Sequence, residues 1–203
     1  MLLFVVKSYF KRSDIMYSLF IDTHDDIIKI ILFKDGKIIE NNVKESSMQH
    51  SVYTMPMIEE TLKNNKITPN ELNEIIVVNG PGSFTGVRIG VTIAKTMAYL
   101  LNISIKSIDM LEIKSLFVDD DKKIVIESEK NGKYIGTFNK NNIPIEDYIY
   151  LKNSEFEEYK KNNKISEINN INYEKVYEYL RNKETVNPHG VNPIYIKKIG
   201  VQM

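Results

Sequence analysis

The residues that could carry out chemistry lie in three short stretches of the sequence. Residues 22–26 hold three acids and a histidine, His50 stands alone, and residues 80–86 hold three glycines ahead of an apolar run. Carboxylates and imidazoles transfer protons or bind metal ions, and the free N–H groups of a glycine-rich loop before a helix can hold phosphate. These residue types allow either a hydrolase that uses Asp22 and His50 or a phosphate-binding protein.

The glycine-rich stretch has the form of a connection between a strand and a helix. Residues 75–78 are apolar and β-branched, as in a buried strand, and Ser83 or Thr85 can cap a helix that follows the turn. The stretch matches neither the G-x-x-x-x-G-K-[ST] nor the G-x-G-x-x-G phosphate pattern. It is therefore either a structural turn or a phosphate contact made by Gly82, Ser83 and Thr85.

The predicted helix after this turn carries a stripe of small residues. Positions four apart lie one above the other on a helix, and each internal glycine costs about 1 kcal/mol relative to alanine. The stripe therefore indicates that another backbone approaches closely, either within the protein or from a helix of a second chain. The small residues are Gly86, Gly90, Ala94 and Ala98.

Residues 79–90 also carry a family resemblance. Their sequence, N-G-P-G-S-F-T-G-V-R-I-G, closely resembles the G-P-G-S-F-T-G-[LV]-R-[IV]-G signature of the bacterial TsaB (YeaZ) family, and Ala94-Lys95 continues the likeness. The resemblance implies a non-catalytic subunit of the machinery that adds a threonylcarbamoyl group to an adenosine of tRNA. Such a subunit binds and activates the TsaD-type transferase, a TsaE-like ATPase then joins, and tRNA is reached indirectly through the complex.

The order of the predicted elements gives the fold class. Three short strands come first, and Asp35-Gly36 between the last two is a strong hairpin signal. A helix, a strand and the glycine-rich helix follow, which is similar to the opening of an actin-like (ribonuclease-H-like) α/β domain, the fold of the TsaB family. The three strands are expected at residues 17–22, 27–33 and 37–40.

The same resemblance predicts a division of the chain into two lobes. Residues 16–118 form the first actin-like lobe, and residues 119–203 form a second, reduced lobe. The resemblance begins just after Met16, so residues 1–15 are interpreted as a non-native or disordered extension. The first long helix is expected over residues 46–65. Its apolar positions at helical spacing are Met48, Val52, Met55, Ile58 and Leu62.

The first hairpin departs from the pattern of actin-like ATPases. Asp22-Thr23 resembles the D-T-S-T start of the family, and in those ATPases the corresponding hairpin holds phosphate and metal. Here His24, Asp25 and Asp26 follow, and added carboxylates repel a nucleotide. We therefore expect no intrinsic cofactor. Asp22 is either a turn or cap residue or, with Thr23, a contact to a nucleotide at a subunit interface. That contact set is Asp22, Thr23, Gly82, Ser83 and Thr85.

His50 offers only half of a metal site. The TsaD family has H-x-x-x-H at the corresponding helix, whereas the position four after His50 is Thr54. A single histidine does not supply that pair of ligands, so no metal is expected. His50 is interpreted as a helix-capping or interface residue.

The composition limits the classes of partner. The 203 residues include 27 basic and 27 acidic side chains, so the net charge of +0 does not favour direct binding of tRNA. There is no cysteine, which fits a cytoplasmic protein, and no apolar run approaches the roughly 20 residues of a membrane span.

The function predicted from these observations is a scaffold with no catalysis of its own. Two alternatives stay open: a stand-alone actin-like ATP-binding protein or metalloprotease-like hydrolase, and a homodimer that uses the same helices. Arg88 can pair with an acidic group of the partner or with a phosphate. The predicted interface residues are His50, Gly86, Arg88, Gly90, Ala94, Met97 and Ala98.

Overall fold

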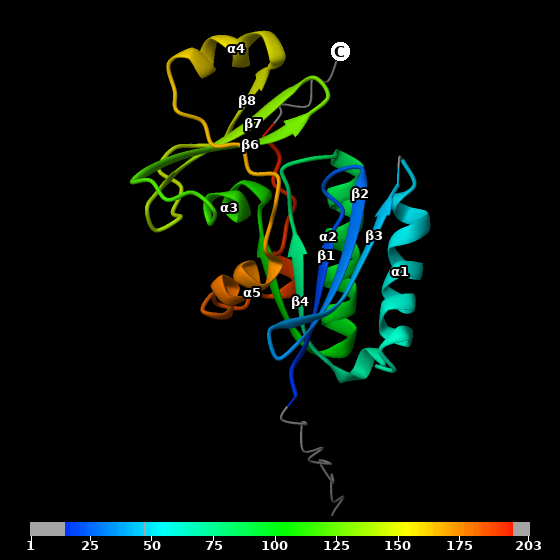
Figure 1. Ribbon diagram of the computed structural model, residues 1–203. Coiled ribbons are helices and arrows are strands. Elements are labelled where there is room, and N and C mark those ends of the chain that lie inside the picture. The colour runs from blue at the N-terminus through cyan, green and yellow to red at the C-terminus, as the bar shows by residue number, and fades with distance from the viewer. Residues whose placement is uncertain (1–14, 47, 197–203) are drawn as a thin grey trace, which may run out of the picture.

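The computed structural model describes residues 15–46 and 48–196 and centres on a five-stranded mixed sheet (Figure 1). Strands β1 (Tyr17–Asp22), β2 (Ile27–Lys34) and β3 (Lys37–Glu45) form an antiparallel meander. Strands β4 (Leu72–Val78) and β5 (Ser104–Ile108) continue the sheet beside β1, and all three run parallel. Parallel neighbours end at the same edge, so the turn after β1 lies beside the glycine-rich loop after β4.

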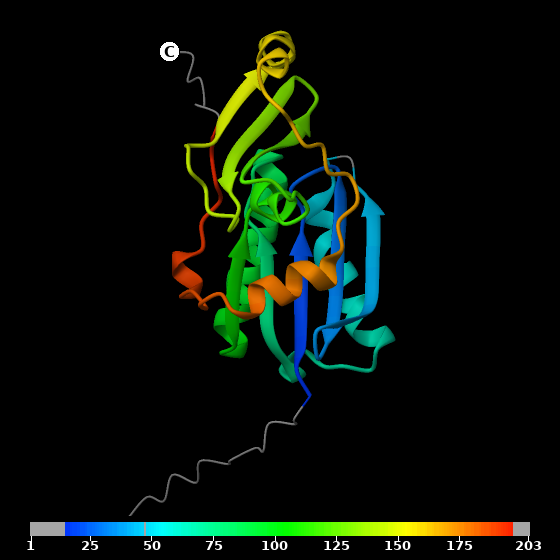
Figure 2. The same cartoon turned by 60° about the vertical axis from the view of Figure 1, so that its left-hand side comes forward.

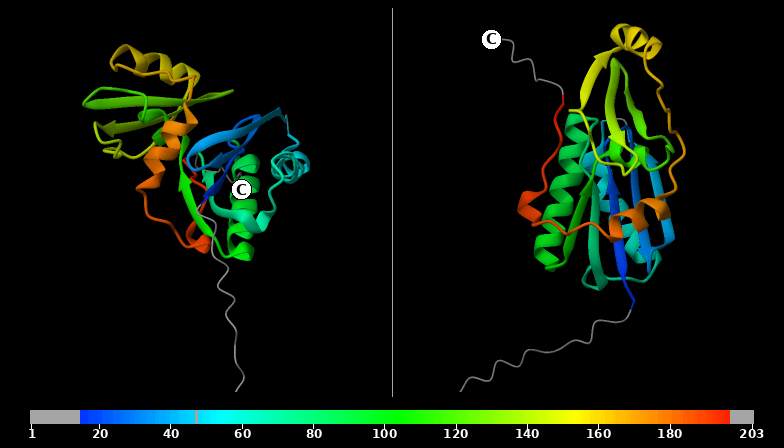
Figure 3. Two further views of the ribbon diagram at one scale, coloured as in Figure 1. Left: turned by 60° about the horizontal axis from the view of Figure 1, so that its bottom comes forward. Right: turned by 90° about the vertical axis from the view of Figure 1, so that its left-hand side faces the viewer.

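Helices cover both faces of this sheet. Helix α1 (His50–Asn64) and helix α2 (Phe84–Leu101) share one face, where they close an apolar core over the strands (Figure 3). A short 3-10 turn, η1 (Pro69–Glu71), leads from α1 into β4. Helix α5 (Tyr173–Arg181) packs on the opposite face (Figure 2). The sheet is therefore buried on both sides, which explains why its central strands are almost continuously apolar.

A smaller antiparallel sheet stands at the end of the first sheet where β1 and β4 finish (Figure 1). It consists of β6 (Lys122–Glu129), β7 (Gly132–Asn139) and β8 (Ile149–Lys152), followed by helix α4 (Asn153–Lys161). Helix α3 (Met110–Ser115) connects the two parts and packs against β6 and β7.

The last described part of the chain returns to the first sheet. Helix α5 contributes Val176 and Leu180 to the core that contains Phe20, and the 3-10 turn η2 (Pro188–Gly190) packs against α2. Beyond η2, the backbone N–H of Ile194 donates to the Asn79 oxygen at 2.8 Å. The division between lobes at residues 118 and 119 stays a prediction, but these later elements pack on the first sheet.

The predicted elements are present, and two of their bounds differ most from the prediction. Strand β3 extends to Glu45 instead of ending at residue 40, and α1 begins at His50 instead of residue 46. The expected extension at residues 1–15 lies outside the described residues except for residue 15. Within the described ranges, no helix combines the length and the apolar character needed to cross a membrane.

Candidate functional site

The stripe of small residues on α2 faces the interior of the molecule. A side chain added at Gly86 would place its Cβ 2.2 Å from the carbonyl oxygen of Thr23, and one added at Gly90 would lie 2.3 Å from Thr23 Oγ1. Thr23 Oγ1 donates to the Gly86 carbonyl oxygen at 2.7 Å. The close approach inferred from the glycines is confirmed, but the neighbour is Thr23, directly after β1 in the same chain.

The prediction of an open ridge on α2 is therefore wrong. Ala94 is 0% exposed and Ala98 is 1% exposed, and Gly86 and Gly90 are buried beside them. These four residues pack against the sheet because α2 lies close to β1 and β4. In this fold no second helix can reach them from outside.

Two further predicted interface residues are also directed inward. His50 is 4% exposed, and its Nε2 lies 2.7 Å from the Asp25 backbone oxygen, so the ring ties α1 to the turn between β1 and β2. Met97 is half-buried and packs against the core beneath α2. His50 therefore has a structural contact, and Met97 reaches the surface only in part.

The outward surfaces of α1 and α2 carry the exposed apolar side chains. On α1 the exposed positions Val52 and Met55 are three apart, as one side of a helix requires, and Met48 lies in the turn just before α1. We define the outer face as five side chains with their exposed fractions: Met48 97%, Val52 59%, Met55 46%, Tyr99 62% and Leu100 73%. Met48, Val52 and Met55 carried the apolar spacing in the sequence, but only its later part, Ile58 and Leu62, is buried.

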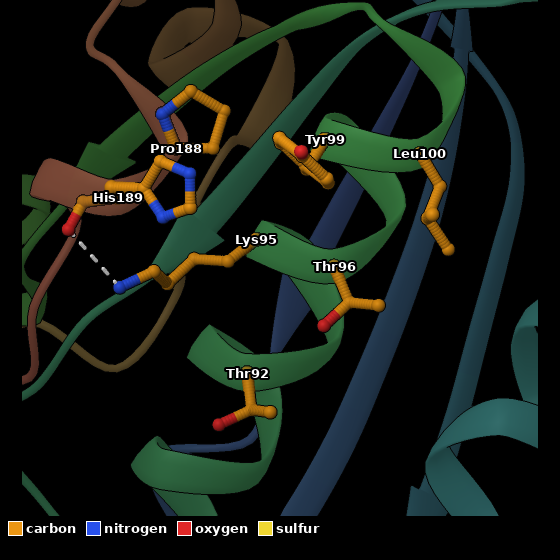
Figure 4. Close-up of a pocket in the computed structure, with 7 residues that line it drawn as sticks. All are labelled: Thr92, Lys95, Thr96, Tyr99, Leu100, Pro188 and His189. Carbon is orange, nitrogen blue, oxygen red and sulfur yellow. Dashed lines mark hydrogen bonds between the residues drawn. The ribbon is translucent and has the colours of Figure 1, made fainter.

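A groove follows the outer side of α2 where η2 packs against it (Figure 4). The Lys95 ammonium donates to the His189 backbone oxygen at 3.2 Å, and the Tyr99 and His189 rings lie 5.4 Å apart. These contacts fix η2 beside the exposed end of α2. The lining residues are Thr92, Lys95, Thr96, Tyr99, Leu100, Pro188 and His189.

Arg88 is the predicted interface residue that lies on the outside. Its Nε donates to the Tyr195 hydroxyl at 2.6 Å, and its guanidinium carbon lies 3.9 Å from the centre of the Phe84 ring. The two rings are themselves 5.3 Å apart. No acidic side chain of the described residues forms an ion pair with Arg88. The guanidinium is thus held in a fixed position while its charge stays available to an incoming carboxylate.

The glycine-rich loop is occupied by contacts within the protein. The Ser83 side chain caps α2 by accepting from the Gly86 N–H at 3.2 Å, and the Ser83 N–H donates to the His24 backbone oxygen at 2.6 Å. A Cβ on Gly82 would lie 2.1 Å from that same oxygen. Thr85 is exposed. The loop therefore serves as a tight turn against the β1–β2 turn, and a phosphate contact here stays a prediction.

The remaining predicted nucleotide contacts, Asp22 and Thr23, are both 0% exposed. Burial opposes ionisation of Asp22, but the charge and hydrogen bond of His24 outweigh it and lower the pKa of Asp22 to about 2. Among the described residues, no group of three or more His, Cys, Asp and Glu side chains is arranged to hold a metal ion.

Comparisons with known proteins find relatives that are named for the formation of threonylcarbamoyladenosine in tRNA. Residues 37–121 match the family model described as TsaD, tRNA N6-adenosine threonylcarbamoyltransferase. The chain is 40% identical over 97 residues to the Bacillus subtilis protein named tRNA threonylcarbamoyladenosine biosynthesis protein TsaB. The aligned residues cover 48% of this chain and 42% of that protein. It is 32% identical over 83 residues to the Escherichia coli protein of the same name, covering 41% and 36%. These matches support the resemblance of the chain to the TsaB (YeaZ) family.

Solved structures of the TsaB (YeaZ) family share the fold across nearly the whole chain. YeaZ from Pseudomonas aeruginosa superposes with a TM-score of 0.68 at 15% identity, covering 88% of this chain and all of that one. A second Pseudomonas aeruginosa structure, described as similar to peptidase YeaZ, gives a TM-score of 0.70 at 14% identity with 90% of this chain covered. The predicted actin-like α/β fold is confirmed. The sequence matches, by contrast, span less than half the length of the curated relatives named above.

Several residues of the site were missed in the sequence. Tyr195 contacts Arg88 across 107 positions of the chain, and His189 contacts Lys95 across 94, distances over which no local pattern carries information. The outer position of Tyr99 and Leu100 could have been found, because the small residues on α2 mark its inner side and these two lie away from that stripe.

Proposed function

We propose that this chain is a non-catalytic subunit in the formation of threonylcarbamoyladenosine in tRNA, and that it docks on a TsaD-type transferase and activates it. The names of the relatives indicate the process, and the outer face of α1 and α2 is the proposed docking surface. The single observation that carries the docking assignment is this pair of neighbouring helices, with large apolar side chains exposed in the first half of α1 and at the end of α2.

The physical reason is the free energy of burying those side chains. Moving a Val, Leu or Met side chain from water into an interface gains about 1.5–3 kcal/mol for full burial. Two helices side by side also present ridges and grooves into which two helices of a partner can pack as a bundle. Arg88, with its charge unmatched in the described residues, adds a position at which a partner carboxylate binds.

The contacts of the candidate catalytic residues support a role without catalysis. Asp22 is fully buried and paired with His24, while His50 Nε2 is engaged by a backbone oxygen. Neither side chain faces a surface where a substrate could bind. The alternative of an ATP-dependent or metal-dependent hydrolase predicts activity of the purified chain that Asp22→Ala or His50→Ala removes.

Further parts of the proposal follow from the family alone. A TsaE-like ATPase joins the complex, tRNA is contacted through the transferase, and the assembly works in the cytoplasm. A nucleotide at the subunit interface belongs to the same proposal. The outer face can also pair with a second copy of the chain when the transferase is absent, because an isologous contact needs only self-complementarity.

The process is tested by depletion of the chain in its own cells. Mass spectrometry of nucleosides from bulk tRNA should then show a large loss of threonylcarbamoyladenosine, and expression of the wild-type chain should restore it. Unchanged modification after depletion would contradict the proposal. In parallel, light scattering with and without the transferase subunit distinguishes a homodimer from the heterodimer.

A further inference from the structure

The junction between the two sheets contains a buried charged cluster. The turn between β1 and β2 carries His24, and β6 of the second sheet carries Glu127. His24 is 3% exposed and Glu127 is 9% exposed. The contact between them therefore joins the two parts of the molecule in an environment from which water is largely excluded.

Both nitrogens of the His24 ring face carboxylates. Nδ1 lies 2.6 Å from Asp22 Oδ1, while Nε2 lies 3.8 Å from Glu127 Oε2 and 3.9 Å from Asp25 Oδ2. Burial alone would lower the pKa of His24, but the charge and hydrogen bond of Asp22, with a smaller effect of Glu127, raise it to about 10. The ring is an imidazolium at neutral pH.

Two lysines complete the cluster. Lys29 Nζ lies 3.5 Å from both Asp22 Oδ2 and Asp25 Oδ2, and Lys114 Nζ lies 2.7 Å from Glu127 Oε2. Each carboxylate thus has at least one cation beside it. The charges, three negative and three positive, balance within the cluster. A pocket lies beside the cluster, and Tyr173 on α5 lines it together with His24 and Glu127.

This cluster does not fit the nucleotide that an actin-like fold implies. Actin-like ATPases hold phosphate and metal at the hairpin that corresponds to the β1–β2 turn. In this chain the cavity beside that turn is lined by the side chains of Asp25 and Glu127, whose charges repel phosphate. The nearby cations already have carboxylate partners, and Asp22 is not exposed to bind a metal.

We propose that the imidazolium of His24 holds the two lobes together at the place where actin-like ATPases hold a nucleotide phosphate and its metal. The closed arrangement of the lobes then depends on the protein's own ion pairs instead of a bound nucleotide. This inference rests on the fold and the cluster, and it does not depend on the proposed docking to a transferase.

The first test measures the distance between the lobes. The chain has no cysteine, so Ser51→Cys on α1 and Asn141→Cys in the second lobe give two unique sites for nitroxide labels. Without nucleotide, the wild-type background should give one narrow distance distribution by electron double resonance. Glu127→Gln should broaden it, because both His24 and Lys114 lose the carboxylate charge beside them at the junction.

The control for Glu127→Gln is Glu146→Gln. Glu146 pairs with Lys122 at 3.0 Å on the surface, and both residues lie in the second lobe. This variant should leave the distribution and the melting temperature unchanged. Glu127→Gln should lower the melting temperature by about 10 °C, since breaking a buried pair leaves an unmatched charge. An unchanged distance distribution and melting temperature in Glu127→Gln would overturn the proposal.

The second test measures how nucleotide and pH change the stability of the protein. Millimolar Mg-ATP should leave the melting temperature of the wild type unchanged, and a rise of several degrees with narrowing of the distribution would overturn the proposal. The stabilisation by His24 should be complete below pH 6.5 and decrease as the pH rises toward 10, because the pKa is raised in the folded state. His24→Asn should lack this decrease, and the same decrease in that variant would also contradict the proposal.

Discussion

The two sides of α2 differ in burial: one side packs against the rest of the protein, and the other is exposed. On the inner face, Gly86 and Gly90 let the end of β1 approach until Thr23 contacts the helix backbone. On the opposite side of α2, Arg88, Tyr99 and Leu100 are exposed. Small residues thus mark where a backbone comes close, while large exposed side chains mark where the helix is free to bind.

This difference corrects a natural interpretation of the glycine stripe. A stripe of small residues and a docking surface look alike in the sequence, because both are unusual in a soluble helix. Burial separates them, since only the outer face leaves side chains accessible to a partner. The two faces should therefore respond to substitution in different ways, the inner face in stability and the outer face in binding.

The largest effect is expected from the inner face. Gly90→Leu places a side chain where Thr23 Oγ1 lies 2.3 Å from the new Cβ, so the protein should lose about 3 kcal/mol or more of its unfolding free energy. Urea denaturation followed by circular dichroism measures this loss. The matched control is Thr92→Leu, an exposed position on the same helix, which should change stability by less than about 0.5 kcal/mol. A stable Gly90→Leu protein would contradict the burial of the stripe.

A smaller loss is expected from the hydrogen bond across the inner face. Thr23→Val keeps the shape of the side chain and removes the donor to the Gly86 oxygen at 2.7 Å. The unfolding free energy should fall by about 1 kcal/mol, the usual net value of one hydrogen bond. The same urea titration gives the result, and no change at all would show that Thr23 contributes only its volume.

The smallest effect on stability is expected at the exposed contact between Arg88 and Tyr195. Tyr195→Phe removes the hydroxyl that accepts from Arg88 but retains the ring beside Phe84. Because both residues are exposed, the unfolding free energy should change by less than about 0.5 kcal/mol. Affinity for the transferase should fall measurably, since Arg88 is no longer held in place. Equal affinity would remove Arg88 from the docking surface.

The fold was predictable because its signals are local. The Asp-Gly hairpin, the apolar strands and the turn of glycines before α2 each depend on neighbouring residues, and the elements were found close to their observed bounds. The site was less predictable because its contacts join distant segments. The glycines showed that a backbone approaches, but the sequence did not reveal that Thr23 is the neighbour.

The sequence also did not predict which charged residues pair or which apolar residues are exposed. The contact between His24 and Glu127 joins two sheets whose strands lie far apart in the sequence, so the sequence alone did not show that His24 is buried. Met48, Val52 and Met55 fit the same helical period as the buried Ile58, and periodicity alone does not show where a helix leaves its sheet.

The proposed docking surface is tested most directly by the affinity of the purified chain for the proposed partner, a TsaD-type transferase. Isothermal calorimetry should compare Met55→Asp, on the outer face at 46% exposed, with Ile145→Asp, an apolar residue of the second lobe at 49%. The account predicts at least a roughly 100-fold weaker complex for Met55→Asp and wild-type affinity for Ile145→Asp. Wild-type affinity in Met55→Asp, with the protein folded, would contradict the claim that the outer face of α1 and α2 is the docking surface.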